Sequence, residues 1–368
     1  MKKILITSNT DRHIFLCHLP YIKWFEENGY KVDVATNTNQ RILNTNKINL
    51  GMKRNPFSIK NIISIFKLIK ILNKENYELI HTHTPVGSVV TRLAYKFSKS
   101  NAKLIYTCHG FHFYKNSPLY YWLIFYPLEK YLMKYTDVLL VMNEEDYKFA
   151  TKKFKNVKIE FVNGVGFDKS RLDIKTSESE IKEIYNKCGI NKNSFVVTYI
   201  AEYSKRKEQM NLIKKLSKTD IRDTNIKFLL IGDDILNGKI QKMIHKYNLN
   251  NNIITIDFTK DINKYLDISN AVISVSKQEG LPLNILEAIY KKKIIIATGC
   301  RGNIDLVKDN VNGFIIKDIN EMYDKIKYVK ENYDNIKKYY MQGIDIEKYA
   351  SDYVLKQVAL IYHEINKS

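Results

Sequence analysis

Short apolar runs rich in β-branched residues alternate with longer segments whose apolar residues recur three or four positions apart. This alternation is typical of α/β proteins built on parallel sheets. In the first half we expect strands at residues 3–7, 31–36, 79–83, 103–107 and 137–141, and helices at 15–28, from 58 onward, and at 89–97. In the second half we expect strands at 194–200, 227–231, 252–256, 271–275 and 294–297, with a helix at 285–290.

The length of 368 residues is about twice that of a typical single domain, so two domains are expected. The stretch from Asp168 to Asn193 is polar and lacks a strand pattern, which is typical of an interdomain linker. No run of 18 apolar residues is present, so no segment is expected to span a bilayer. The apolar residues 4–6 indicate a first strand rather than a signal segment.

The net charge is +20, and residues 1–168 carry 25 basic and 13 acidic side chains, a surplus of 12. A surplus concentrated there favours an anionic partner: nucleic acid, an acidic membrane surface or a phosphorylated substrate. A general lysine bias of the source proteome explains the charge equally well. The four cysteines are widely separated, form no CxxC pair and show no zinc-like spacing with histidine, as expected for free thiols in a reducing cytosol.

The segment 276–288, SKQEGLPLNILEA, carries the most chemical information. A strand ends, a glycine turn follows, and Pro282 stands where a helix would begin, so free backbone N–H groups could bind a diphosphate there. Glu279 precedes this helix and Glu287 lies about one and a half turns inside it, so both carboxylates can face one crevice and hold hydroxyls of a hexose and a ribose. From spacing alone, a capping glutamate and a solvated helical glutamate are the more common explanation.

The Glu-x7-Glu spacing in EGLPLNILEA resembles the signature of retaining GT-B glycosyltransferases of family 4 (group 1), which includes bacterial capsule, exopolysaccharide and lipid-linked glycan assembly enzymes. Four further segments resemble this family in the same order: HTHTP at 81–85, YTCHGFHFY at 106–114, NGVGFD at 163–168 and RGNIDLV at 301–307. The resemblance implies two Rossmann-like domains with parallel sheets: an acceptor domain at 1–168 and a donor-nucleotide domain at 169–345. A C-terminal helix at 346–368 is expected to pack toward the N-terminal domain.

The resemblance also assigns roles to individual residues. Glu279 would contact the donor-sugar hydroxyls, Glu287 the ribose, and His109 the region of the donor sugar and its leaving oxygen. A packed histidine at a strand end is the alternative for His109. The full set of residues implied to bind the donor is Lys207, Arg206, Gly280, Leu281, Pro282, Leu283, Glu287 and Thr259.

One position departs from the family pattern. Glu202 stands where most members have an arginine, and Arg206 is the expected replacement for that cation, while Lys207 matches the family lysine. A solvated loop is the alternative for the run 205–207. Thr259 belongs to the segment 256–262, which resembles the loop that reads the base through its backbone.

The expected activity is retaining transfer of a hexose or N-acetylhexosamine from a UDP-sugar to an undecaprenyl-diphosphate-linked saccharide. The family implies no cofactor and no metal, and places the enzyme in the cytoplasm, peripheral on the inner face of the plasma membrane. A UDP-sugar 2-epimerase shares the architecture and is the first alternative. A basic nucleic-acid-binding protein is the second, although no recognition motif supports it. An NAD-dependent oxidoreductase is disfavoured because no GxGxxG follows the first strand.

The run 119–128, LYYWLIFYPL, is apolar or aromatic throughout and is flanked by Lys115, Lys130 and Lys134. Aromatic residues beside lysines suit the interface of an anionic membrane. A helix buried against the sheet explains the run equally well.

Overall fold

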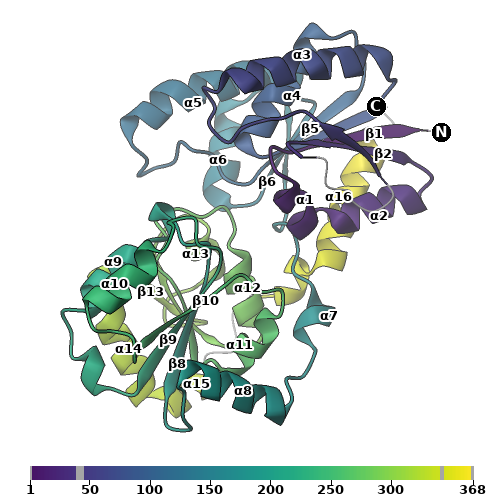
Figure 1. Ribbon diagram of the computed structural model, residues 1–368. Coiled ribbons are helices and arrows are strands. Elements are labelled where there is room, and N and C mark those ends of the chain that lie inside the picture. The colour runs from purple at the N-terminus through teal and green to yellow at the C-terminus, as the bar shows by residue number, and fades with distance from the viewer. Residues whose placement is uncertain (1, 39–44, 340–343, 366–368) are drawn as a thin grey trace. The chain divides into compact units, whose positions relative to one another are not determined.

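The computed structural model describes residues 2–38, 45–339 and 344–365. The chain divides into two compact units, each of which contains one parallel sheet (Figure 1). Unit 1 comprises Met1–Gly166 and Ser351–Ser368, and unit 2 comprises Phe167–Ala350. The expected α/β class and the two parallel-sheet units are therefore confirmed.

Unit 1 has a seven-stranded sheet in the order β3-β2-β1-β4-β5-β6-β7. The inner strands are almost wholly buried because helices cover both faces, which explains the continuous apolar runs in β1 and β6. The strands are β1 Lys3–Thr7, β2 Lys31–Thr36, β3 Asn46–Asn49, β4 Leu79–His83, β5 Lys103–Cys108, β6 Val138–Val141 and β7 Lys158–Phe161. The helices are α1 Asp11–Cys17, α2 Leu19–Glu27, α3 Ile59–Lys74, α4 Pro85–Phe97, α5 Leu119–Leu132, α6 Glu144–Lys153 and α16 Ser351–Ile365.

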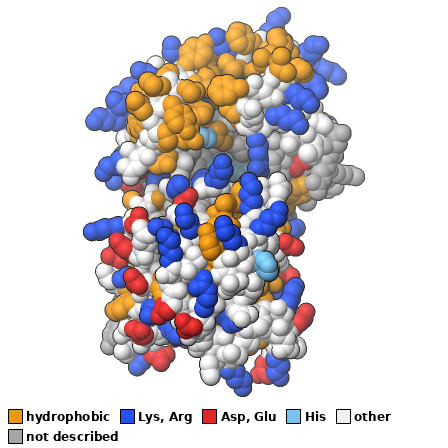
Figure 2. All heavy atoms as spheres, turned by 60° about the vertical axis from the view of Figure 1, so that its left-hand side comes forward, with side chains coloured by type: hydrophobic (Ala, Val, Ile, Leu, Met, Phe, Trp, Pro, Cys, Tyr) orange, Lys and Arg blue, Asp and Glu red, His pale blue; other side chains and the backbone are white. Residues whose placement is uncertain are grey.

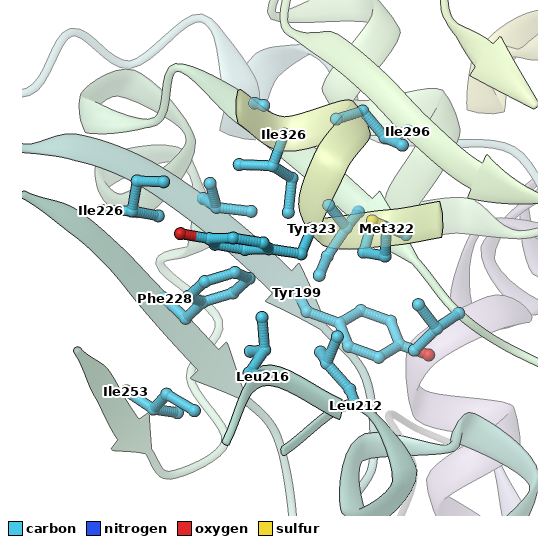
Figure 3. Close-up of a cluster of buried hydrophobic side chains, with 14 of the residues drawn as sticks. Tyr199, Leu212, Leu216, Ile226, Phe228, Ile253, Ile296, Met322, Tyr323 and Ile326 are labelled. Carbon is cyan, nitrogen blue, oxygen red and sulfur yellow. The ribbon is translucent and has the colours of Figure 1, made fainter. Parts of the chain in front are cut away.

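Unit 2 has a six-stranded sheet in the order β10-β9-β8-β11-β12-β13. Its strands are β8 Phe195–Ile200, β9 Ile226–Ile231, β10 Ile253–Ile256, β11 Ala271–Ser274, β12 Ile294–Thr298 and β13 Phe314–Ile316. Its helices are α7 Lys169–Leu172, α8 Glu178–Cys188, α9 Gln209–Leu216, α10 Lys239–Lys246, α11 Ile262–Ile268, α12 Leu283–Tyr290, α13 Asn303–Leu306, α14 Met322–Glu331 and α15 Tyr333–Tyr339. Figure 3 shows one face of the core, where Phe228 of the sheet packs among Leu216 of α9 and Tyr323 of α14.

Both sheets have a topological switch point, the place where successive strands are added on opposite sides of the first strand. In unit 1 it lies between β1 and β4, and in unit 2 between β8 and β11. Loops that leave the carboxyl ends of such strand pairs diverge to opposite faces of the sheet, and the crevice between them is where open α/β sheets bind ligands. The two candidate sites described below lie at these positions.

Three expectations from the sequence are wrong. The segment 15–28 is not one helix: α1 ends at Cys17, His18 separates the two helices, and Pro20 occupies the first turn of α2. Proline is favoured there because its missing N–H has no helical acceptor in a first turn. Strands β3, β7 and β13 were not expected, since they lie at sheet edges and have only three or four residues each.

The third correction concerns the expected linker at 168–193, which is folded into unit 2 as α7 and α8. Ser177 and Glu180 form a reciprocal capping box that starts α8. Ile184 and Cys188 on its inner face are buried in a cluster with Leu229 of the sheet. The polar composition of this stretch therefore reflects the exposed face of an amphipathic helix.

Candidate active site

At the switch point of unit 2, the loop after β8 contacts the loop after β11. Lys207 follows β8 in a short 3₁₀ turn, and its Nζ donates to Oε1 of Glu279, which follows β11. The backbone N–H of Lys277 donates to the carbonyl of Arg206 over 3.0 Å, so the two loops are also joined through the main chain. The sequence-predicted residues Lys207, Arg206 and Glu279 are therefore brought together.

The charges of this group are arranged around Glu279, which is only 7% exposed. Arg206 donates from one guanidinium nitrogen to Glu279 Oε2 over 3.2 Å and to the carbonyl of Gln278 over 2.7 Å. Burial raises the pKa of Glu279, but Lys207 and Arg206 together outweigh burial and hold the pKa below its ordinary value. Glu279 is therefore ionised at neutral pH, with Lys207 buried and Arg206 at the surface.

A second segment, the loop after β12, supports this group from behind. Arg301 is 4% exposed and donates from Nε to the backbone carbonyl of Glu279 over 3.1 Å. Gly302 has φ +82°, and a Cβ at this position would lie 2.6 Å from the carbonyl oxygen of Gly280. Glycine is required here both by the backbone conformation and by the close approach of the two loops. Residues 301–302 thus fix the backbone that carries Glu279.

Helix α12 begins after the loop that follows β11 and carries Glu279, with Pro282 as its N-cap. Pro282 provides no side-chain cap, so the N–H groups of Leu283 and Asn284 could meet an anion, while that of Ile285 donates to the carbonyl of Pro282 over 3.2 Å. Leu281 and Leu283 are half-buried and pack against the apolar cluster beneath the helix. Four of the residues that the resemblance implies to bind the donor lie around this N-terminus: Gly280, Leu281, Pro282 and Leu283.

Glu287 lies deeper in α12 and pairs with a different cation from Glu279. It is 3% exposed and accepts a hydrogen bond from Arg171 of α7. Burial raises the pKa of Glu287 to about 7, because the nearby Arg171 guanidinium offsets only part of the cost of removing the carboxylate from water. Arg171 was not among the sequence-predicted residues, since the stretch that contains it was interpreted as a linker.

Thr259 and Glu202 also lie at the carboxyl edge of this sheet, but none of the contacts described above connects either residue to Glu279. Thr259 follows β10, and its hydroxyl accepts from the backbone N–H of Asp261 over 3.0 Å. Glu202 follows β8 and is half-buried, with its carbonyl accepting from Gln209. Of the run 205–207, Lys205 and Arg206 are exposed and Lys207 is buried, so the solvated-loop interpretation fails for Lys207.

The switch point of unit 1 holds imidazoles instead of charged groups. His109 follows β5, and its Nε2 lies 2.9 Å from Nε2 of His13 in α1. Nε2 of His13 lies 3.1 Å from Nε2 of His18, whose ring stacks on His83 at the end of β4 with centroids 3.7 Å apart. Each of these four rings offers one nitrogen as a ligand atom, and these four atoms all lie within 4.8 Å of one another. We refer to His13, His18, His83 and His109 as the histidine cluster.

Burial keeps these rings neutral. It lowers the pKa of His13 to about 4 and holds the pKa of each of His18, His83 and His109 well below the ordinary value. His109 and the segment 81–85 were predicted from the sequence, whereas His13 and His18 were not. Their position could have identified them, because both follow the first strand, whose carboxyl end adjoins that of β4.

The backbone beside the histidine cluster is unusual. Thr84, between His83 and α4, has φ +65°, a conformation that is rare for a β-branched residue. A Cβ on Gly87 would lie 2.7 Å from Thr84 Oγ1 and 3.0 Å from the backbone nitrogen of Asn9, so α4 meets the loop after β1 closely. Local strain of this kind concentrates at functional sites.

Comparison with known proteins agrees with this architecture. The family description "Glycosyl transferases group 1" matches residues 180–344, and "Glycosyl transferase 4-like" matches residues 3–143. The chain is 32% identical over 319 residues to the putative glycosyltransferase EpsD of Bacillus subtilis, covering 86% of this chain and 84% of that one. It is 28% identical to an Escherichia coli UDP-Gal:alpha-D-GlcNAc-diphosphoundecaprenol alpha-1,3-galactosyltransferase, covering 72% and 68%.

The fold is shared with solved GT-B structures. Anabaena Alr3699/HepE in complex with UDP-glucose superposes with a TM-score of 0.79 over 99% of this chain and 100% of that one, at 19% identity. A glycosyltransferase from Rickettsia africae gives a TM-score of 0.78 at 18% identity, over 100% and 99% of the two chains. With EpsD similar over most of both sequences, the chain belongs to the group 1 (family 4) glycosyltransferases and is a glycosyltransferase enzyme of the GT-B fold.

Proposed function

We propose that this enzyme transfers a hexose or N-acetylhexosamine from a UDP-sugar to an undecaprenyl-diphosphate-linked saccharide in cell-surface polysaccharide synthesis. The observation that carries the donor half is the ionised Glu279, buried between Lys207 and Arg206 at the start of α12. The solved neighbour with UDP-glucose bound and the E. coli relative that uses UDP-Gal support a UDP-sugar. That relative's name also supports a lipid-diphosphate acceptor.

The cations would serve the departing nucleoside diphosphate, whose negative charge grows as the glycosidic bond breaks. Glu279 holds Lys207 and Arg206 in place through its ion pairs, so the two cations require little reorganisation to meet the phosphates. Glu279 itself accepts hydrogen bonds and would bind sugar hydroxyls, while Glu287 would bind the ribose. Thr259 and the backbone around it would lie near the base.

His109 completes the proposed catalytic set with Glu279. Its neutral ring can exchange hydrogen bonds with the sugar hydroxyls or the leaving oxygen without adding a charge. We propose that transfer retains the anomeric configuration, with the leaving diphosphate assisting attack on the same face. Because Lys207, Arg206 and the α12 N-terminus meet the diphosphate charge, we propose that UDP binding needs no divalent cation.

The direct test is to incubate the enzyme with a panel of UDP-sugars and measure which one raises its melting temperature. The stabilising donor is then combined with a lipid-diphosphate saccharide, and the product is analysed by NMR. We expect a new glycosidic linkage with the donor's configuration and the same UDP affinity with and without EDTA. An inverted product would overturn retention. A free epimerised sugar in place of a disaccharide would identify a 2-epimerase.

We also propose that unit 1 docks on the cytoplasmic face of an anionic membrane, where a lipid-linked acceptor resides. Among residues 2–38, 45–339 and 344–365, no helix is long and apolar enough to cross a bilayer. Figure 2 shows hydrophobic side chains gathered over one face of unit 1 with Lys and Arg around them. The large exposed apolar residues of α3, α5 and the adjoining loop are Phe57, Ile59, Ile62, Ile63, Phe66, Leu119, Tyr120, Leu123, Ile124 and Tyr131.

Lysines accompany both helices. Helix α3 carries the exposed Lys60, Lys67, Lys70 and Lys74 and no acidic residue. Each lysine near an anionic surface contributes about 1 kcal/mol of attraction, and the apolar side chains add burial in the interface. The run 119–128 therefore has two faces: Trp122, Phe125 and Tyr126 pack on the core, while Leu119, Tyr120, Leu123 and Ile124 are exposed.

Sedimentation with anionic vesicles tests this docking. Leu123→Ser combined with Ile124→Ser should reduce vesicle binding at least several-fold and leave the melting temperature nearly unchanged. Trp122→Ser combined with Phe125→Ser is the matched control, which should lower the melting temperature because these rings pack on the core. Unchanged vesicle binding in the folded Leu123/Ile124 variant would mean that a different surface of the protein docks on the membrane. Binding to duplex DNA in place of vesicles would favour a nucleic-acid partner.

A further inference from the structure

We propose that the histidine cluster binds one divalent transition-metal ion, with zinc as the best fit. The proposal rests on the geometry of unit 1. It does not depend on the donor residues assigned to unit 2, but it shares His109 with the proposed catalytic set. Its ligands are separated by up to 96 positions and come from the first turn of α1, the α1–α2 junction, and the carboxyl ends of β4 and β5. The fold, and not any local sequence motif, assembles the site.

The nitrogen positions match what a metal requires. A tetrahedral zinc site has Zn–N distances of about 2.0–2.1 Å, so its ligand nitrogens lie about 3.3 Å apart. The three Nε2 atoms of His13, His18 and His109 converge with separations of 2.9 and 3.1 Å to the central His13. The fourth ring, His83, places its ligand atom within 4.8 Å of all the others.

Hydrogen bonding alone does not satisfy this arrangement. A neutral imidazole nitrogen offers either one proton or one lone pair. Nε2 of His13 faces two other Nε2 atoms, so it can make a good hydrogen bond to only one of them. Nδ1 of His83 is buried and has no hydrogen-bond partner among the residues that the structure describes, although a buried polar atom normally has one. A cation accepts a lone pair from every ring, which removes the conflict at His13. With Nδ1 as the ligand atom of His83, the cation also gives that nitrogen a partner.

A neighbouring histidine shows what a packed structural ring looks like in the same fold. His81 lies with its ring centroid 4.1 Å from that of His83. Its Nδ1 pairs with the hydroxyl of Tyr362 over 2.6 Å, and its Nε2 pairs with Oγ1 of Thr107 over 2.7 Å. Both nitrogens of His81 are therefore occupied, which excludes it as a ligand and marks the contrast with His83.

The chemistry of the ligands selects the metal class. Imidazole nitrogen suits zinc, copper, nickel and iron, whereas magnesium and calcium prefer oxygen ligands. Four protein ligands complete a tetrahedral shell, which is the arrangement of structural zinc sites. The ion would hold α1 and the α1–α2 junction against the ends of β4 and β5. Ligation through Nε2 would leave Nδ1 as the ring nitrogen of His109 available to substrate.

A metal titration of the tag-free, full-length chain tests the proposal. After chelator treatment and dialysis, Co²⁺ is added while the visible absorption of four-coordinate Co²⁺ is recorded. We expect saturation at one Co²⁺ per chain, full displacement by one equivalent of Zn²⁺, and a melting temperature that rises with Zn²⁺ concentration. If no stoichiometric binding occurs in the folded wild-type chain, the proposal is wrong.

Variants identify the ligands. His18→Asn and His83→Asn should each weaken Co²⁺ binding by at least 100-fold, while His245→Asn, an exposed histidine in unit 2, should bind like wild type. Should the buried variants fail to fold by circular dichroism, the half-buried His13→Asn decides the question by the same measurement. Unchanged affinity in folded His13→Asn would overturn the ligand set. UDP affinity, measured separately, reports on the donor site of unit 2. It therefore shows whether the proposed donor site or the proposed metal site is wrong.

Discussion

The two units place opposite chemistry at the same position of their sheets. At the switch point of unit 2, buried carboxylates meet lysine and arginine, as in the group of Glu279, Lys207 and Arg206. At the switch point of unit 1, four neutral imidazoles meet one another and no ion pair forms among them. One fold thus supplies a charged crevice and a neutral, metal-competent crevice, which teaches that the switch point fixes where a site lies while the loop residues decide its chemistry.

Burial acts in the same direction at both sites, because it favours the uncharged form of any titratable group. It raises the pKa of Glu287 to about 7 and lowers the pKa of His13 to about 4. At Glu279, where two cations surround the buried carboxylate, the charged form is favoured despite burial. The contrast between Glu279 and Glu287 within one helix region follows from the number of neighbouring cations.

The largest effect is expected for Glu279→Gln. The amide keeps the shape but loses the charge that orients Lys207 and Arg206, and with it a charged hydrogen bond to the donor sugar. The cost should be about 2–4 kcal/mol in the transition state, or roughly 30- to 1000-fold in transfer rate. Glu331→Gln, on an exposed surface of α14, is the control and should transfer at the wild-type rate. Wild-type turnover in folded Glu279→Gln would remove the donor-site assignment.

The pH dependence of stability sharpens the contrast between the two glutamates. Because the folded-state pKa of Glu287 is raised, the folded chain loses stability as pH rises from the ordinary value near 4.5 to about 7, and the loss is constant above that. Relative to Glu287→Gln, the free energy of unfolding of the wild type should fall by about 3 kcal/mol between pH 4 and pH 8. Urea denaturation of both chains at a series of pH values measures this difference.

A flat difference between wild type and Glu287→Gln across this range would mean that the pKa of Glu287 is the same in the folded and the unfolded chain, with Arg171 fully offsetting the cost of burial. The transfer activity of the same variant is a separate measurement. It should fall if Glu287 binds the ribose, and wild-type activity would leave Glu287 with a structural role only.

Smaller effects are expected from removing single cations. Lys207→Ala should weaken the binding of UDP by about 10- to 100-fold, since a hydrogen bond to a charged group contributes about 1.5–3 kcal/mol. Arg206→Ala should have a smaller effect because its guanidinium is exposed to water. Calorimetric titration with UDP compares the two. If Arg206→Ala were as damaging as Lys207→Ala, Arg206 would be the full replacement for the arginine that Glu202 displaces.

The smallest effect is expected from a substitution in the loop after β12, which supports the backbone of Glu279. Gly302→Ala places a Cβ against the carbonyl of Gly280 and strains a left-handed backbone, so it should lower the free energy of unfolding by about 1–2 kcal/mol. The displaced loop carries Glu279, so UDP-sugar affinity should fall as well. Gly238→Ala is the matched control: its φ is also positive, at +77°, but nothing lies within 4 Å of the added Cβ. Equal losses in both variants would mean that backbone strain alone, and not contact with Gly280, sets the cost.

The sequence by itself determined the class of fold, most strands and the donor motif. The buried strands could be predicted because a parallel sheet covered on both faces requires continuous apolar runs, and the position of Glu279 followed from a strand, a glycine turn and a proline in sequence. Edge strands such as β3 were not predicted, because a strand paired on one side needs little apolar sequence. Helix α8 was not predicted, because its polar face dominates its composition.

Only the tertiary structure decided which groups meet. Arg171 reaches Glu287 over 116 positions of sequence, and His109 reaches His13 over 96. No local pattern encodes such contacts, because they depend on which strands are neighbours and on where each loop leaves the sheet. The same holds for the run 119–128, whose aromatic residues divide between core and surface only once α5 is oriented on the fold. Sequence periodicity predicts most of the buried strands, but the order of strands in the sheet determines the chemistry at its edge.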